Sequence, residues 1–83
     1  MLRPDPYWRT RFGSIVSGIG VSRIVCEFTA LGDPIRPTTI YNWVYGIAAP
    51  SFDRCVTLTQ ATHGEITLAD ISAHRTALRQ VKR

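Results

Sequence analysis

The sequence predicts an all-α fold of five short helices, in a single domain over residues 1–83. Apolar side chains recur three or four positions apart in successive segments, which is the period of a helix with one buried face. Glycine, proline and capping residues separate these segments, as expected where short helices begin and end. The chain of 83 residues is 45% hydrophobic, which suits one folded domain with a small core. Residues expected in that core are Trp8, Phe12, Ile15, Val25, Phe28, Leu31, Ile40, Trp43, Val56 and Ile71.

The first helix is expected over about residues 6–18. Asp5-Pro6 places a capping side chain before a proline at the first helical position, where the missing N–H costs nothing. Gly18 and Gly20 are expected to end the helix. Gly13 either weakens its middle or lets another helix approach closely, and the sequence leaves both options open.

The second helix is expected over about residues 22–32, with Ser22 as its N-cap. Gly32 follows the last apolar residue, where a residue of left-handed conformation ends many helices. Pro37 suits the first turn of a third helix, expected over about residues 37–46. The turn between the two, from Gly32 to Arg36, is longer than the usual three or four residues.

The third helix is polar on one side. Ile40, Trp43 and Val44 can face inward, which leaves its threonines, its asparagine and its tyrosines facing outward. Two crossed helices with a polar second member are typical of the helix-turn-helix motif. The sequence therefore predicts a compact helix-turn-helix domain.

Two further helices complete the predicted fold. Ser51 is expected to cap a fourth helix over about residues 52–62, ended by Gly64. Thr67 and Asp70 resemble a capping box at the start of a fifth helix. The residues expected to face inward from these helices are Phe52, Cys55, Val56, Thr59, Leu68, Ile71, Leu78 and Val81.

Charge and hydropathy narrow the possible environment. The chain has ten Lys and Arg residues and six Asp and Glu residues, which gives a net charge of +4. The end of the chain, residues 75–83, carries four cations and no acid, which is compatible with a polyanionic partner. No apolar run approaches the roughly 20 residues of a membrane span, and the first residues lack the apolar core of a signal peptide. We therefore expect a cytoplasmic protein without a membrane partner.

No pattern of catalytic or metal-binding residues is found. His63 and His74 are interpreted as surface histidines, because neither lies near a nucleophile or an orienting acid in the sequence. Cys26 and Cys55 are expected to be buried free thiols rather than a disulfide, and their spacing does not suit zinc. We expect no enzymatic activity, no metal or cofactor, and no small-molecule substrate.

The segment from Ile19 to Ile71 resembles the small Cro-like helix-turn-helix repressors of phages and prophages, in particular the YdaS/Cro type. The likeness is carried by Ile40-Tyr-Asn-Trp43, the connector from Gly46 to Pro50, and Cys55. The passage Thr62-His-Gly64-Glu-Ile66-Thr67 is similar to that group's "T-G-G-x-V-T" approach to the last helix. The resemblance implies a lambda-repressor-like fold and a homodimer on a near-palindromic operator in double-stranded DNA. It also implies a transcriptional regulator in the cytoplasm of a bacterium or a phage-infected host, and a repressor rather than an activator.

Elementary recognition chemistry assigns roles to the candidate residues. Asparagine can pair bidentately with adenine, and a threonine methyl can contact the methyl of thymine. Arg36 could reach guanine or a phosphate, and Ser22 and Arg23 stand at a helix start, where free N–H groups favour a phosphate. For Tyr41 and Tyr45, half-buried packing is an equal alternative. The predicted DNA-binding residues are Ser22, Arg23, Arg36, Thr38, Thr39, Tyr41, Asn42 and Tyr45.

A second function stays open from the sequence. The same fold could serve as a protein-interaction module, antitoxin-like or a phage adaptor, without specific DNA binding. For the expected homodimer, the candidate interface residues are Leu68, Leu78 and Val81.

Overall fold

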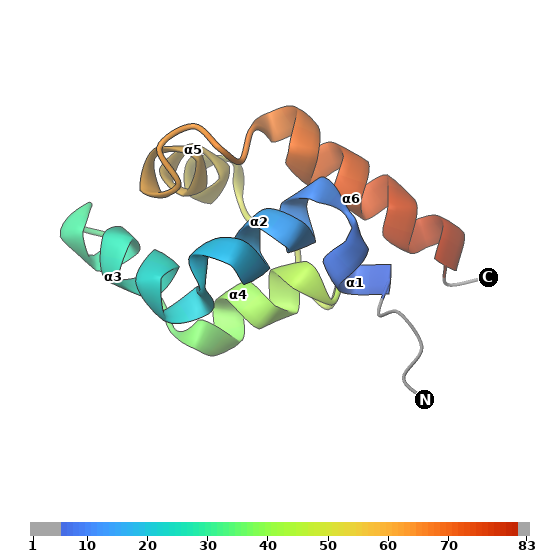
Figure 1. Cartoon of the computed structure of the whole chain (residues 1–83). Helices are drawn as coiled ribbons and strands as arrows, with labels where there is room; N and C mark the ends of the chain where they lie inside the picture. Colours follow the sequence, from blue (N-terminus) through green and yellow to red (C-terminus); the bar gives the residue numbers. More distant parts are fainter. Residues whose placement is uncertain (1–5, 82–83) are drawn as a thin grey trace.

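The structure, a computed structural model, describes residues 6–81, which form an all-helical fold without strands (Figure 1). Its Cα radius of gyration is 12.2 Å, close to the ~12 Å of a compact chain of this length. The helices are α1 (Pro6–Arg9), α2 (Arg11–Ile19), α3 (Val21–Ala30), α4 (Pro37–Val44), α5 (Phe52–Ala61) and α6 (Leu68–Val81). The expected cap Asp5, the cations Lys82 and Arg83, and the side chain of Val81 lie outside the described residues.

The expected first helix is two helices, so the prediction of five helices was wrong by one. Thr10 is extended, with φ −70° and ψ 163°, and its Oγ1 accepts a hydrogen bond from the backbone N of Gly13 at 3.0 Å. The chain therefore breaks at Thr10, because its hydroxyl caps a new helix instead of continuing the old one. Gly13 is the site of a close approach, since a Cβ there would collide with the carbonyl oxygen of Tyr7 and lie 2.8 Å from the Cα of Trp8.

Helix α3 begins before Ser22, so the prediction of Ser22 as N-cap was wrong. Gly20, with φ 98°, ends α2 and is the N-cap of α3. A glycine takes this conformation without steric cost, and the two helices meet at 83°. The left-handed conformation of Gly32 was predicted correctly: its φ is 85°, and its N bonds the carbonyl of Thr29 at 3.0 Å.

The caps of α4 and α5 agree in part with the predictions. Pro37 opens α4 and Ser51 caps α5, accepting a hydrogen bond from the backbone N of Arg54 at 3.3 Å. The end of α5 differs, because His63 takes the first left-handed position, with φ 54°, and Gly64 follows at φ 83°. The N of His63 bonds the carbonyl of Gln60 at 3.1 Å, which closes the last turn.

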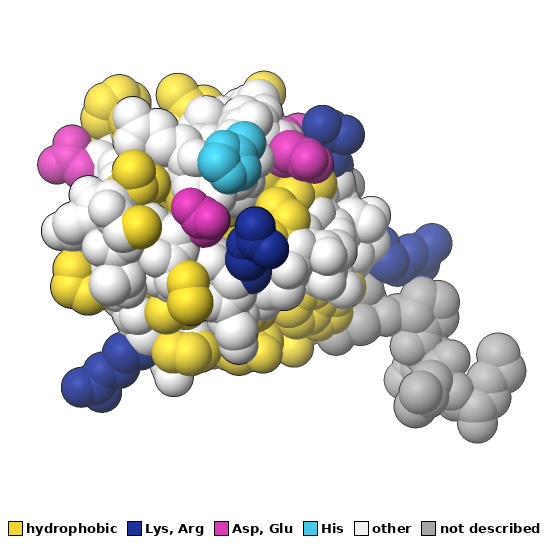
Figure 2. Space-filling view, turned by 60° about the vertical axis from the view of Figure 1, so that its left-hand side comes forward, with side chains coloured by type: hydrophobic (Ala, Val, Ile, Leu, Met, Phe, Trp, Pro, Cys, Tyr) yellow, Lys and Arg dark blue, Asp and Glu magenta, His cyan; other side chains and the backbone are white. Residues whose placement is uncertain are grey.

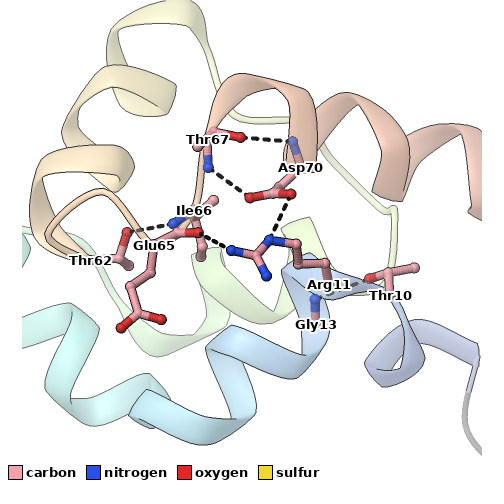
Figure 3. A network of polar contacts seen from close by, with 8 residues as sticks. All are labelled: Thr10, Arg11, Gly13, Thr62, Glu65, Ile66, Thr67 and Asp70. Carbon is pink, nitrogen blue, oxygen red and sulfur yellow. Dashed lines mark hydrogen bonds and ion pairs between the residues drawn. The ribbon is translucent and has the colours of Figure 1, made fainter.

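The start of α6 is a capping box that also holds α2 (Figure 3). The N of Thr67 donates to Asp70 Oδ2 at 3.0 Å, and the N of Asp70 donates to Thr67 Oγ1 at 3.3 Å. Arg11 Nε lies 3.2 Å from Asp70 Oδ1, and Arg11 Nη2 donates to the carbonyl of Glu65 at 3.5 Å. Burial alone would raise the pKa of the Asp70 carboxyl, but the hydrogen bonds of Thr67 and the charge of Arg11 outweigh it and lower that pKa.

The core lies between α2, α3, α5 and α6, with the inner side of α4 closing it. Helix α2 packs against α1, α3 and α6, while α5 packs against α3 and α6. Three residues expected in the core, Trp8, Ile15 and Val25, are only half-buried at its margin. The buried apolar cluster consists of Phe12, Val16, Ile24, Phe28, Ile40, Trp43, Val44, Cys55, Leu58, Ala61, Ile66 and Ile71.

Several residues predicted to be buried are exposed instead. Leu31 is 47% exposed because it is the C-cap of α3, beyond its last buried turn. Val56 and Phe52 are exposed because α5 buries the side that carries Cys55, Leu58 and Ala61. Leu68, at the first position of α6, is 49% exposed. On the side of the molecule where α3 and α5 lie, apolar side chains are scattered among polar and charged ones (Figure 2).

The predictions for the burial of His74 and Cys26 were also wrong. His74 is 1% exposed rather than a surface residue, because it lies on the side of α6 that carries Ile71 and Leu78. Cys26 is exposed rather than buried, since it faces away from Ile24 and Phe28 on α3. Both cysteines are free thiols, and burial raises the pKa of the Cys55 thiol.

Two findings concern membranes and assembly. Among the described residues no single helix is long and apolar enough to cross a membrane, and α2 and α3, which together reach that length and hydropathy, are bent by 83°.

Leu78 is 5% exposed, and a Cβ at Gly46 would lie 2.8 Å from its Cδ1. Leu78 therefore belongs to the interior of the chain, and its prediction as a dimer-interface residue was wrong.

Candidate nucleic-acid interface

The outward face of α4 is set by the residues that the helix buries. Ile40, Trp43 and Val44 are buried, at 0%, 5% and 0% exposure. At 100° per residue the opposite side of the helix is centred near residues 38 and 45. The predicted contact residues Thr38, Tyr41, Asn42 and Tyr45 therefore share this face, while Thr39 lies at its edge.

The N-terminal part of this face is open. Thr38 is exposed, Tyr41 is 41% exposed, and Thr39 and Asn42 are half-buried. Within residues 6–81, the side-chain amide of Asn42 has no hydrogen-bond partner, while its backbone carbonyl accepts from the N of Ile47 at 2.9 Å. An amide that is held on a helix but unsatisfied by the protein can still bond to a ligand.

The C-terminal part of the face is covered by α1. Trp8 Nε1 donates to the hydroxyl of Tyr45 at 3.2 Å, and the rings of Tyr7 and Tyr45 meet edge to face at 4.9 Å. Of the two options for Tyr45, packing is therefore the one observed. Tyr41 combines both, because its ring lies 6.4 Å from those of Trp8 and Tyr45 while part of it stays exposed. Sequence reasoning treated Trp8 only as core and did not connect α1 with α4.

The N-terminus of α3 borders the same surface. Its cap, Gly20, offers no side-chain hydrogen bond, and the first internal bond runs from the N of Ile24 to the carbonyl of Gly20 at 3.1 Å. Ser22 and Arg23, in the first turn, are exposed, and the guanidinium of Arg23 lies 3.7 Å from Glu27. Gly20 and Val21 line one hollow together with Tyr41 of α4. Free backbone N–H groups and the outward face of α4 therefore meet at one surface.

The turn before α4 is fixed from α5. Arg54 Nε and Nη2 donate to the two carboxylate oxygens of Asp33, each at 3.2 Å. This paired geometry restrains a turn that is longer than usual. Arg36, the N-cap of α4, is exposed and forms none of the ion pairs among the described residues. No sequence pattern predicted the role of Arg54, because nothing in its spacing links it to Asp33, 21 positions away.

The structure therefore brings the predicted site residues together only in part. Tyr41 of α4 shares a hollow with the start of α3, but Arg23 lies in another hollow beside the end of α5. Thr38 and Arg36 are exposed at the start of α4, and Tyr45 is covered by packing. No group of three or more His, Cys, Asp or Glu in the described part of the chain could hold a metal ion. Comparison with protein-family models, curated proteins and solved structures found no match.

Proposed function

We propose that this protein binds double-stranded DNA sequence-specifically as a Cro-like helix-turn-helix regulator, acting as a repressor. Helices α3 and α4 are its two-helix motif, and α4 enters the major groove. The proposed role is non-enzymatic and needs no cofactor. The observation that supports it most is the hollow shared by Gly20 and Val21 of α3 with Tyr41 of α4, because DNA readers of this type combine backbone positioning and base contact on one surface.

Each part of that surface suits one task. The exposed first turn of α3 offers free N–H groups and the Ser22 hydroxyl to a phosphate. Thr38 and Asn42 offer a hydroxyl, a methyl and an amide to base edges in the groove. Tyr41 stands between the two parts and can contact either. Because one such motif reads few base pairs, a homodimer on a near-palindromic operator is part of the proposal, with recognition helices ~34 Å apart.

Selection of bound duplexes from a random library tests this proposal. We expect a near-palindromic site to be enriched, and a single half-site to bind more weakly than the whole. Against the selected site, Asn42→Ala should cost about 1–3 kcal/mol and relax the preference at one base pair. Thr38→Ala should act in the same direction but more weakly, and Thr39→Ala least, because Thr39 lies at the edge of the face.

Matched substitutions away from the surface serve as controls. Gln60→Ala on α5 removes an exposed amide and Thr76→Ala on α6 an exposed hydroxyl, and both should leave affinity and preference unchanged. If no sequence is enriched, or if the preference for the selected site over a scrambled one survives Asn42→Ala and Thr38→Ala, α4 does not read bases. The protein-interaction module would then be favoured, since Ile47 and Phe52 are 73% and 71% exposed.

A further inference from the structure

The connector between α4 and α5 leaves two adjoining hollows beside α6. One lies under the connector, where Ile47, Ala48 and Pro50 face Ile71 and Arg75. The other lies between α5 and α6, where Cys55 faces Leu68, Ser72 and Arg79. The two share Ala49, Pro50, Ile71 and Arg75. We call these two adjoining hollows together, from Ile47 to Arg79, the connector groove.

More than half of the residues that line the connector groove are apolar, while its exposed surface is about as polar as it is apolar. Its α6 wall is a single stripe of the helix, since residues 68, 72, 75 and 79 follow one another at four- and three-residue spacing, with residues 71 and 76 on either side. Leu68 at one end of this stripe is 49% exposed, and Ile47 on the facing connector is 73% exposed. Large apolar side chains exposed beside a hollow favour contact with another apolar surface.

The rim of the connector groove is positive. Arg75 and Arg79 lie one helical turn apart, both exposed, and neither takes part in the ion pairs of residues 6–81. None of the residues that line the two hollows is Asp or Glu. Two cations without a local counter-ion favour a partner that carries carboxylates.

We propose that the connector groove binds a segment of another protein that carries apolar side chains flanked by carboxylates. The apolar side chains would lie against Leu68 and Pro50, with the carboxylates at Arg75 and Arg79. A second copy of this chain fits less well, because a symmetric contact places the same patch on both sides. That arrangement would bring the two pairs of arginines together.

The groove lies away from the surface proposed for DNA. Helix α4 contributes Trp43 to it from the buried side, and none of the outward residues of α4. In Figure 1, α4 runs below α2, whereas α6 begins above α2 and descends on the right. The partner segment and a duplex would therefore be bound at the same time, which makes this inference independent of the proposed function.

The test uses the full chain and a synthetic helical peptide with Leu at positions i and i+4 and Glu on either side. The same peptide with Lys in place of Glu is the comparison. We expect the Glu peptide to bind roughly tenfold tighter than the Lys peptide. Its binding should shift the backbone amide resonances of Ala49, Leu68, Ser72 and Thr76.

Charge reversal makes the test specific. Arg75→Glu with Arg79→Glu should remove or invert the preference for the Glu peptide, while Arg9→Glu, the same change at an exposed arginine outside the groove, should preserve it. Leu68→Ala, at an exposed position, gives a second variant in case the charge reversal unfolds the chain, and it should weaken both peptides. Equal binding of the two peptides, or resonance shifts outside the groove, would overturn the proposal. So would groove shifts caused by raising the protein concentration, which would mean a second copy, or by adding duplex alone.

Discussion

At the scale of single residues, His74 joins three helices through one chain of hydrogen bonds. Its Nε2 lies 2.8 Å from the carbonyl oxygen of Val44, and its Nδ1 lies 2.6 Å from Thr10 Oγ1. A carbonyl only accepts, so Nε2 carries the proton and Nδ1 accepts from the Thr10 hydroxyl. That hydroxyl in turn accepts from the N of Gly13. The neutral ring therefore has a hydrogen-bond partner for each of its nitrogens. It also provides a donor to the carbonyl at the end of α4 and an acceptor for the hydroxyl that caps α2.

This arrangement predicts that stability depends on pH near neutrality. Burial lowers the pKa of the His74 imidazole, with the carbonyl bonds of Val44 and Trp43 opposing the shift. The unfolded chain then binds a proton at its ordinary pKa of about 6.5 while the folded chain resists it. The contribution is fully present above that pH, and as the pH falls below it the free energy of unfolding should drop by up to about 1.4 kcal/mol per pH unit.

Urea unfolding between about pH 7.5 and 5 measures this slope. His74→Gln keeps a donor and an acceptor without titrating, so it should remove most of the slope, whereas His63→Gln at an exposed position should keep it. The Asp70 contribution does not interfere, because a carboxyl whose pKa is lowered loses its contribution only below about pH 4. An unchanged slope in His74→Gln would show that the ring is not held neutral.

The structural role of a residue could be predicted from the sequence where it depends on neighbours within one turn. Gly32, Pro37, Ser51 and the pair Thr67 and Asp70 act within one turn of their own position, so the predictions for them were confirmed. His74 was assigned wrongly because its partners, Thr10 and Val44, are 64 and 30 positions away.

At the scale of elements, the break between α1 and α2 lets four aromatic side chains gather on α4. The break turns Tyr7 and Trp8 toward Tyr41 and Tyr45, with ring centroids 4.9 to 6.4 Å apart. The sequence could not predict it, because the apolar spacing from Trp8 to Ile19 fits one continuous helix equally well. The deciding feature is a single threonine cap, which competes with the helix only when tertiary contacts reward it.

Gly13→Ala tests the close approach of α1 to α2. In an open helix position alanine stabilises by about 0.5–1 kcal/mol relative to glycine. Here the new Cβ would collide with the backbone of Tyr7, which cannot move as a side chain does. We expect a net loss of about 1–3 kcal/mol, as for other overpacked sites, with a change in Trp8 fluorescence.

Gly18→Ala in the same helix is the matched control for Gly13→Ala. Nothing lies within 4 Å of a Cβ built at Gly18, so this variant should be neutral or more stable in a urea titration. If Gly13→Ala stabilised the chain as much as Gly18→Ala, the two helices would not be in the close contact described.

At the scale of the whole molecule, the exposed cations fall on different sides. Arg36 lies at the start of α4, and Arg23, at the start of α3, has only a 3.7 Å contact with Glu27. Arg75 and Arg79 lie on the groove side of α6. The net charge of +4 is therefore not evidence for one binding surface, and the sequence could not assign each cation to a side because that depends on how the helices pack.

The salt dependence of duplex binding shows whether the duplex binds on the side of α3 and α4 or on the groove side of α6. Each phosphate contact releases a counter-ion, so its loss reduces the slope of log affinity against log salt by about one unit. We expect Arg36→Ala and Arg23→Ala each to produce that change without altering which sequence is preferred. The contact of Arg23 with Glu27 does not offset this, because exposed ion pairs contribute at most about 1 kcal/mol.

The control for this measurement is Arg75→Ala combined with Arg79→Ala, which removes two exposed cations from the other side of the molecule. If the duplex docks on α3 and α4, this variant should keep the slope of the unaltered chain, because exposed charges more than ~10 Å from a phosphate are largely screened. A slope reduced by two units in this variant, with Arg23→Ala and Arg36→Ala unchanged, would place the duplex across α6. Helix α4 would then not be the element that enters the groove, whatever affinity the protein has for DNA.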